Sequence, residues 1–121
     1  MTALLVALAG GAGAAVRFVV DTAVRRAVPA TFPLGILVVN ASGSLLLGLL
    51  TGALLDTAGD QQVLAVLGIG FCGGYTTFGT AMVDTVRMLQ DGRRRAALVH
   101  HLGMAVVCLG AAGVGLAVTV R

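Results

Sequence analysis

The stretch Gly73-Gly74-Tyr75-Thr76-Thr77-Phe78-Gly79-Thr80 places three glycines and three threonines in eight residues, inside a run from Gln61 to Val83 that carries no charge. Glycine and threonine are poor helix formers. A helix broken between Gly73 and Thr77 frees backbone carbonyls, and within hydrocarbon these must be buried in protein or bind something. Unwound carbonyls commonly coordinate Na⁺. Composition alone leaves a broken helix and an intact helix with a Gly-rich packing face equally open.

Charges divide the chain into four apolar segments, each long enough to cross a bilayer, since a spanning helix needs about 20 apolar residues. The connections between them are short, which favours antiparallel neighbours in an up-down bundle. We therefore expect one all-α transmembrane domain, residues 1–121, whose third helix is broken mid-membrane. The expected spans are approximately 2–24, 33–55, 61–88 and 95–120.

Composition excludes most soluble functions. Of the 121 residues, 58% are apolar and 11% are charged, whereas soluble domains carry about 25% charged residues. A soluble chain this small cannot hide so much apolar surface, which argues against a water-soluble enzyme, a disordered chain and a nucleic-acid binder. Cys72 and Cys108 each lie in an uncharged apolar run and are interpreted as small buried residues rather than a disulfide.

Arginine placement predicts the orientation in the membrane. The loops at 25–32 and 90–95, which carry five arginines, lie on one side of the membrane, and the only arginine on the opposite side is Arg121. Arginines in short loops mark the cytoplasmic side. We therefore expect these two loops in the cytoplasm, both termini outside, and insertion that is nearly single-handed.

Two polar residues inside the spans each have two interpretations. Asn40 either serves as helix–helix glue or donates its amide N–H groups to an anion, with Ser42 or Ser44 nearby. Arg17 either extends to the membrane interface or sits in a wet vestibule, where it raises the local anion concentration.

Aromatic and titratable residues near the third and fourth spans are also ambiguous. The positive ring edge of Phe78, beside Thr77 and Thr80, can face a small anion, although ordinary packing explains the ring equally well. His100 and His101 are expected to face the membrane interface. Asp84 is expected to pair with Arg87 at i,i+3.

Together these residues resemble the CrcB, or Fluc, family of small fluoride channels, over nearly the whole chain. The Gly-rich run Gly10–Phe18 is similar to the family's first helix, which ends in an arginine and an aromatic residue. The segment Val39–Ser44 is similar to its second-helix asparagine motif. The segment Gly73-Gly74-Tyr75-Thr76-Thr77-Phe78 is similar to the GGxTTF signature of its broken third helix.

The resemblance implies a channel that lets fluoride leave the cytoplasm passively and so lowers fluoride toxicity, in the plasma (inner) membrane of a bacterium. It implies an antiparallel dual-topology dimer with a structural Na⁺ at the interface, bound by the backbone carbonyls of Gly73 and Thr76. The resemblance and the residue chemistry together assign the anion pathway to Asn40, Phe78, Thr77, Thr80, Ser42, Ser44 and Arg17.

The chain departs from the family pattern in two places. Ala81 stands where a second pore phenylalanine is expected, and Gly79 and Met82 replace serines. The fourth span lacks the expected aromatic hydroxyl and Ser/Thr track, with only the two histidines near that place. With single-handed insertion, these departures favour a dimer with an inverted paralogue over a dimer of two copies.

Two alternatives remain beside the channel subunit. A proton-coupled exporter of the small multidrug-resistance type has this size and topology, but it needs an intramembrane carboxylate, and the chain has no Glu. A non-conducting structural subunit of a heterodimeric channel is the other. No nucleophile–base pair is apparent, so an enzyme is not expected.

Overall fold

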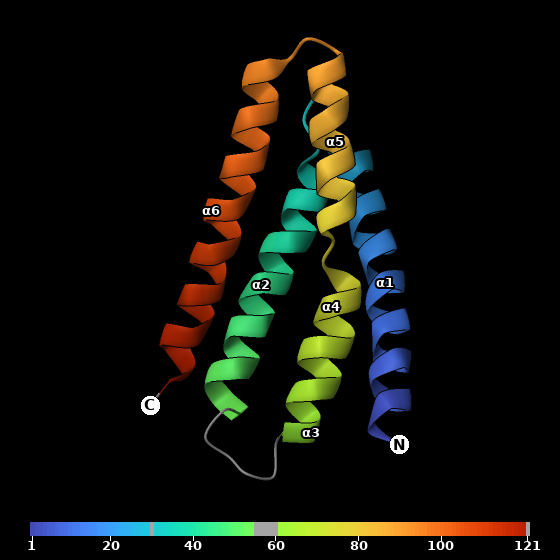
Figure 1. The fold of residues 1–121 in the computed structure, drawn as a ribbon, viewed down its shortest axis with the longest axis vertical. Helices are drawn as coiled ribbons and strands as arrows, with labels where there is room; N and C mark the ends of the chain where they lie inside the picture. The colour runs from blue at the N-terminus through green and yellow to red at the C-terminus, as the bar shows by residue number, and fades with distance from the viewer. Residues whose placement is uncertain (30, 55–60, 121) are drawn as a thin grey trace.

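The computed structural model describes residues 1–29, 31–54 and 61–120, and these form an antiparallel helical bundle without strands in that part of the chain (Figure 1). The prediction of four spanning helices is confirmed, because four helical segments are long and apolar enough to cross a membrane. The elements in order are α1 (Thr2–Ala27), α2 (Leu34–Leu54), α3 (Gln61–Leu64), η1 (Ala65–Cys72), α4 (Gly73–Tyr75), α5 (Phe78–Gln90) and α6 (Arg94–Thr119).

The two arginine loops lie at the same end of the bundle, and the described termini lie toward the other end (Figure 1). The α5–α6 connection is a tight helix stop, in which Gly92 adopts a φ of 74° and donates its N–H to Leu89. Arg93 N–H donates to the Met88 carbonyl, which completes a Schellman motif. Ala30 of the first loop, Leu55 of the predicted second span and Arg121 lie outside the described residues.

Close backbone contacts hold the helices together. Gly48 brings α2 against α6, because a Cβ there would collide with the Ala112 carbonyl. Gly74 brings α4 against α1, because a Cβ there would collide with the Gly10 backbone. Small residues allow such approaches between membrane helices, where lipid is as apolar as the side chains and packing drives association.

The buried core is small and lies between α2, α5 and α6. It contains Ile36, Ala81 and Met104, with Met82 and Cys108 packed against it. Both cysteines are free thiols, as the sequence indicated. Many large apolar side chains elsewhere are exposed, which suits a protein whose outer surface faces lipid or a partner.

The third span runs from Gln61 to Gln90 and is interrupted once. Its first half is helical through α3, η1 and α4, and η1 is a wide π-helix. Only Thr76 and Thr77 are extended. The predicted break is therefore confirmed but shorter than expected, because Gly73 and Gly74 stay helical where α4 packs on α1.

Candidate functional site

The break in the third span has a defined backbone geometry. Thr76 has φ −78° and ψ 158°, and Thr77 has φ −149° and ψ 121°. The helical segment before it ends at Tyr75, and the Cys72 carbonyl accepts from both the N–H and the hydroxyl of Thr76, at 2.9 and 2.8 Å. The carboxyl end of one helical segment therefore meets the amino end of the next, which brings backbone acceptors and donors to one place.

Asn40 of α2 holds this break open. Its Nδ2 donates to the Thr77 carbonyl at 2.9 Å, and its Oδ1 accepts from the Thr77 N–H at 2.8 Å. That N–H would otherwise donate to the Gly73 carbonyl in a continuous helix. Nδ2 also donates to Met104 Sδ at 3.2 Å. The buried amide is thus helix–helix glue, and one of its N–H groups faces only a weak acceptor.

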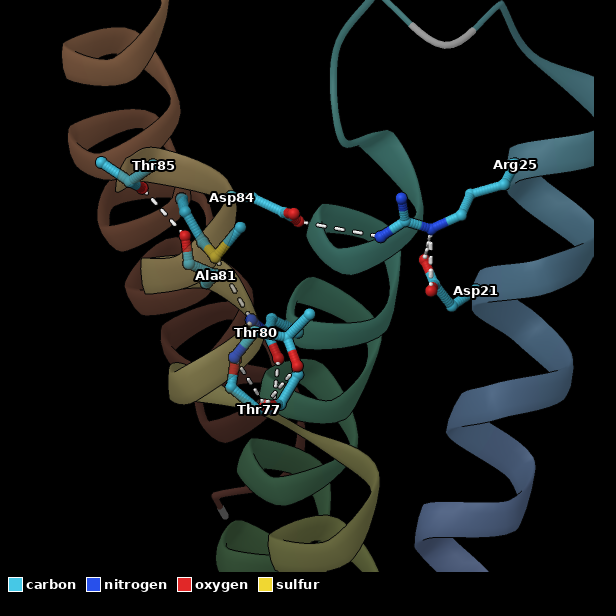
Figure 2. Close-up of polar contacts among 9 residues, drawn as sticks. Asp21, Arg25, Thr77, Thr80, Ala81, Asp84 and Thr85 are labelled. Carbon is cyan, nitrogen blue, oxygen red and sulfur yellow. Dashed lines mark hydrogen bonds and ion pairs between the residues drawn. The ribbon is translucent and has the colours of Figure 1, made fainter. Parts of the chain in front are cut away.

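Thr77 starts α5 as its N-cap. Its Oγ1 accepts from the Thr80 N–H at 3.2 Å and lies 3.2 Å from the Thr80 hydroxyl (Figure 2). This contact satisfies one of the donors that a helix start leaves free. The two threonine side chains therefore bond to each other and fix the turn that follows the break.

A cavity of about 380 Å³ opens beside the break, which we call the inner cavity. Its walls come from α2, the third span and α6. Phe78 is 75% exposed at this cavity, and Ala81, at the position of the expected second phenylalanine, is buried against it. Of the predicted pathway residues, the cavity is bordered by Asn40, Ser44, Thr77 and Phe78.

The other predicted pathway residues lie elsewhere. Ser42 Oγ donates to the Val38 carbonyl at 2.7 Å and contacts the Tyr75 hydroxyl at 2.9 Å, so it is tied to its own helix and to α4. Thr80 does not border the cavity and acts through Thr77. Arg17 is half-buried and also does not border the cavity.

The two carbonyls expected to bind a cation have different surroundings. Within the described ranges, no hydrogen bond reaches the Gly73 carbonyl, because Thr77 N–H is taken by Asn40. Gly73 is exposed, and a Cβ there would meet open space. The Thr76 carbonyl accepts a long hydrogen bond from Arg17 Nη1 at 3.5 Å. The free carbonyl suits a cation, whereas the second one already faces a guanidinium.

The expected pairing of Asp84 with Arg87 is wrong. Asp84 is buried and forms an ion pair with Arg25 of α1, at 3.7 Å between Oδ2 and Nη2 (Figure 2). Arg25 Nε also donates to both carboxylate oxygens of Asp21 at 2.9 Å. The contact comes from the packing of α1 near α5, which a spacing rule within one helix does not include.

The expectation that His100 faces the interface is also wrong, whereas His101 is exposed and borders the inner cavity. His100 is 2% exposed, and its ring meets Phe32 edge to face, with centroids 5.4 Å apart and an interplanar angle of 80°. Neither ring nitrogen has a hydrogen-bond partner among the described residues. The spacing of His100 from Ala97 and Met104, both buried, follows one helix face and was the signal for this burial.

Comparison with known proteins places the chain in a family. The model of a family described as CrcB-like protein, Camphor Resistance (CrcB), matches residues 4–116. The chain belongs to this family. The predicted resemblance is thereby confirmed over nearly the whole sequence. With its four spanning helices, this CrcB-family chain is a multi-pass protein of the bacterial plasma membrane.

Several curated CrcB relatives cover most of the chain. Fluoride-specific ion channel FluC 1 of Leifsonia xyli subsp. xyli is 47% identical over 116 residues, which cover 96% of this chain and 85% of the relative. Fluoride-specific ion channel FluC 2 of Cutibacterium acnes is 48% identical over 122 residues, covering 100% and 99%. Fluoride-specific ion channel FluC 2 of Mycolicibacterium paratuberculosis is 47% identical over 107 residues, covering 88% and 84%.

Proposed function

We propose that this chain is a subunit of a channel through which fluoride leaves the cytoplasm passively. Its relatives in Leifsonia xyli subsp. xyli and Cutibacterium acnes, which are named fluoride-specific ion channels, support this function. The structural observation that carries it is the helix break held open by Asn40 beside the inner cavity. Passage through a channel makes and breaks no covalent bond, so the protein is not an enzyme.

Asn40 can act on the anion without giving up its structural role. One N–H of its amide is used by the Thr77 carbonyl, and the other faces the thioether of Met104. A fluoride ion is a far better acceptor than a thioether, because hydrogen bonds to charged groups are the stronger ones. An anion in the cavity therefore displaces Met104 from this N–H, and the amide stays anchored at the break.

The remaining pathway residues supply weaker attractions. The exposed ring of Phe78 can turn its positive edge toward an anion, and Ser44 offers a hydroxyl at the same cavity. Arg17 contributes positive potential from beyond the cavity wall. Several weak sites suit a channel, since each must bind fluoride in place of water and then release it.

The structural Na⁺ expected at Gly73 and Thr76 remains a proposal with mixed support. The free, exposed Gly73 carbonyl fits a cation ligand. The Thr76 carbonyl fits only if the Arg17 guanidinium turns away, since two cations at one oxygen repel. When bound, the ion would supply positive charge to the Gly73 carbonyl, which has no hydrogen-bond donor within the described ranges, and to the Thr76 carbonyl beside it.

A dimer with an inverted relative is the assembly we propose, with a dimer of two copies as the alternative. Two arginine loops at one end of the bundle support a single orientation. Exposed apolar side chains beside the open Gly73, namely Ile69 and Phe78, support a partner on that face. Ala81 at the inner cavity supports a pathway completed by residues from a relative.

The exporter alternative loses support in the structure. Such a transporter needs a buried carboxylate that is free to exchange protons. Both acids within the described spans, Asp21 and Asp84, lie against Arg25.

Fluoride efflux from liposomes tests the proposal directly. Purified protein, alone or with an inverted relative, should release loaded fluoride to an external electrode when a K⁺ carrier balances the charge. Protein-free liposomes give the background rate. Efflux only with the relative would support the heterodimer, and efflux at background in both preparations would overturn the channel function.

A further inference from the structure

His100 is buried without a hydrogen-bond partner, and the pathway described above does not use it. Its side chain is 2% exposed, and both ring nitrogens lack partners among residues 1–29, 31–54 and 61–120. Burying a polar group without a hydrogen-bond partner destabilises a fold. An apolar residue would avoid this cost, so the imidazole at this place indicates a partner that the chain itself does not provide.

A second cavity lies at the end of the bundle that carries the arginine loops. It has a volume of about 230 Å³, and we call it the outer cavity. Its lining includes the arginines Arg25, Arg87 and Arg93 and the acids Asp84 and Asp91. The excess of positive charge favours anions there.

One aromatic contact joins the linings of the two cavities. Phe32 lines the outer cavity, and His100 lines the inner cavity. Their rings touch edge to face, with centroids 5.4 Å apart. This pair therefore stands between the arginine-lined outer cavity and the inner cavity that Asn40 borders.

We propose that His100 donates an imidazole N–H to the anion as it passes between the outer and inner cavities, and that Phe32 positions the ring for this contact. The inference rests on the proposed channel function and adds a contact on α6 to those from α2 and α5. A neutral imidazole has one N–H donor, which is sufficient for a single passing anion. The weak aromatic contact with Phe32 orients the ring without occupying that donor.

A matched pair of variants separates an anion contact from a packing role. His100→Gln and His100→Met have similar length and shape, but only the glutamine side chain donates a hydrogen bond. Both variants are reconstituted in the same assembly as the conducting wild type. Fluoride efflux and the midpoint of thermal unfolding are then measured on each preparation, with Leu102→Met, on an exposed face of α6 that borders neither cavity, as control.

If His100 contacts the anion, removing its hydrogen-bond donor should lower efflux without lowering the unfolding temperature. His100→Met should lower efflux by about tenfold or more, the effect of one hydrogen bond to a charged group, whereas His100→Gln should stay within about threefold of wild type. His100→Met should nevertheless unfold at the same or a higher temperature, because it removes unpaired buried nitrogens. Leu102→Met should change efflux by less than about twofold.

Two results would overturn the inference in distinguishable ways. If the wild type conducts and His100→Met conducts as well as His100→Gln, the imidazole does not contact the anion, although the channel function stands. If no wild-type assembly releases fluoride, the proposed function fails, and this contact fails with it.

Discussion

Replacing Asn40 by aspartate tests the geometry at the helix break most directly. In Asn40→Asp, the oxygen that accepts from the Thr77 N–H is retained. The Nδ2 atom becomes a second oxygen, 2.9 Å from the Thr77 carbonyl oxygen and 3.2 Å from Met104 Sδ. Acceptors then face acceptors, and a negative charge stands where the anion must bind.

The free-energy cost of Asn40→Asp can be estimated one hydrogen bond at a time. Losing the donor to a buried carbonyl leaves that carbonyl unsatisfied, at about 1–3 kcal/mol. Protonation of the new carboxyl restores this one hydrogen bond, but no donor remains for the anion. The loss of a hydrogen bond to a charged group, about 1.5–3 kcal/mol, corresponds to a fall in efflux of about 10- to 100-fold.

The assay is fluoride efflux from liposomes, with thermal unfolding measured on the same protein. Asn40→Ala serves as the comparison, because it removes the donors without adding an acceptor or a charge. We expect Asn40→Asp to block efflux in protein that still folds, and Asn40→Ala to impair efflux to a smaller extent. Unchanged efflux in Asn40→Asp would show that the amide only joins helices and that no anion meets it.

Four further predictions concern stability and insertion. Thr77→Val should destabilise the fold by about 1 kcal/mol, measured by denaturant unfolding, because α5 loses its N-cap. Gly74→Ala should lower the unfolding temperature, at a cost of about 1–3 kcal/mol, because the added methyl group meets the α1 backbone; an unshifted transition would contradict the packing. Arg25→Ala should destabilise by about 1 kcal/mol and Arg87→Ala by less, since only Arg25 pairs with buried Asp84 and its own side chain is half-exposed; equal midpoints for the two variants would argue against the pair. The chain expressed alone should insert with both termini outside, as mapped by thiol labelling of added terminal cysteines, and a mixed population would remove the argument for an inverted relative.

The sequence was sufficient for the parts of the fold that hydrophobicity decides. Four uncharged runs of spanning length predict four helices, and the Gly/Thr cluster predicts the interruption. Its cause was not visible, because the hydrogen bonds between Asn40 and Thr77 join residues 37 positions apart. Helix propensity indicated where the helix is weak. The contact with Asn40 then determined that the Thr77 N–H leaves the helical hydrogen-bond pattern.

The two errors about titratable residues have the same physical origin. His100 and Asp84 were interpreted from their neighbours along the chain, near the ends of spans and beside arginines. Both are instead buried by residues distant in the sequence: His100 contacts Phe32, in the connection before α2, and Asp84 pairs with Arg25 of α1. A rule such as i,i+3 pairing considers only partners on the same helix. In a bundle, each residue can also pair with side chains from neighbouring segments.

The two-residue break also divides the third span into two segments that pack on different neighbours. The first half of the third span is packed on α1 through Gly74, while α5 is joined to α6 by a tight turn and to α2 through Asn40. The third span therefore consists of two helical segments with different neighbours, which are joined by the extended residues Thr76 and Thr77. A rotation about the backbone bonds of Thr76 and Thr77 would change the angle between the two segments of this span while the helix within each segment stays intact, which is the behaviour of a hinge. Because Asn40 grips the peptide groups of this hinge, the residue that faces the anion is also the one that senses any movement between the two halves.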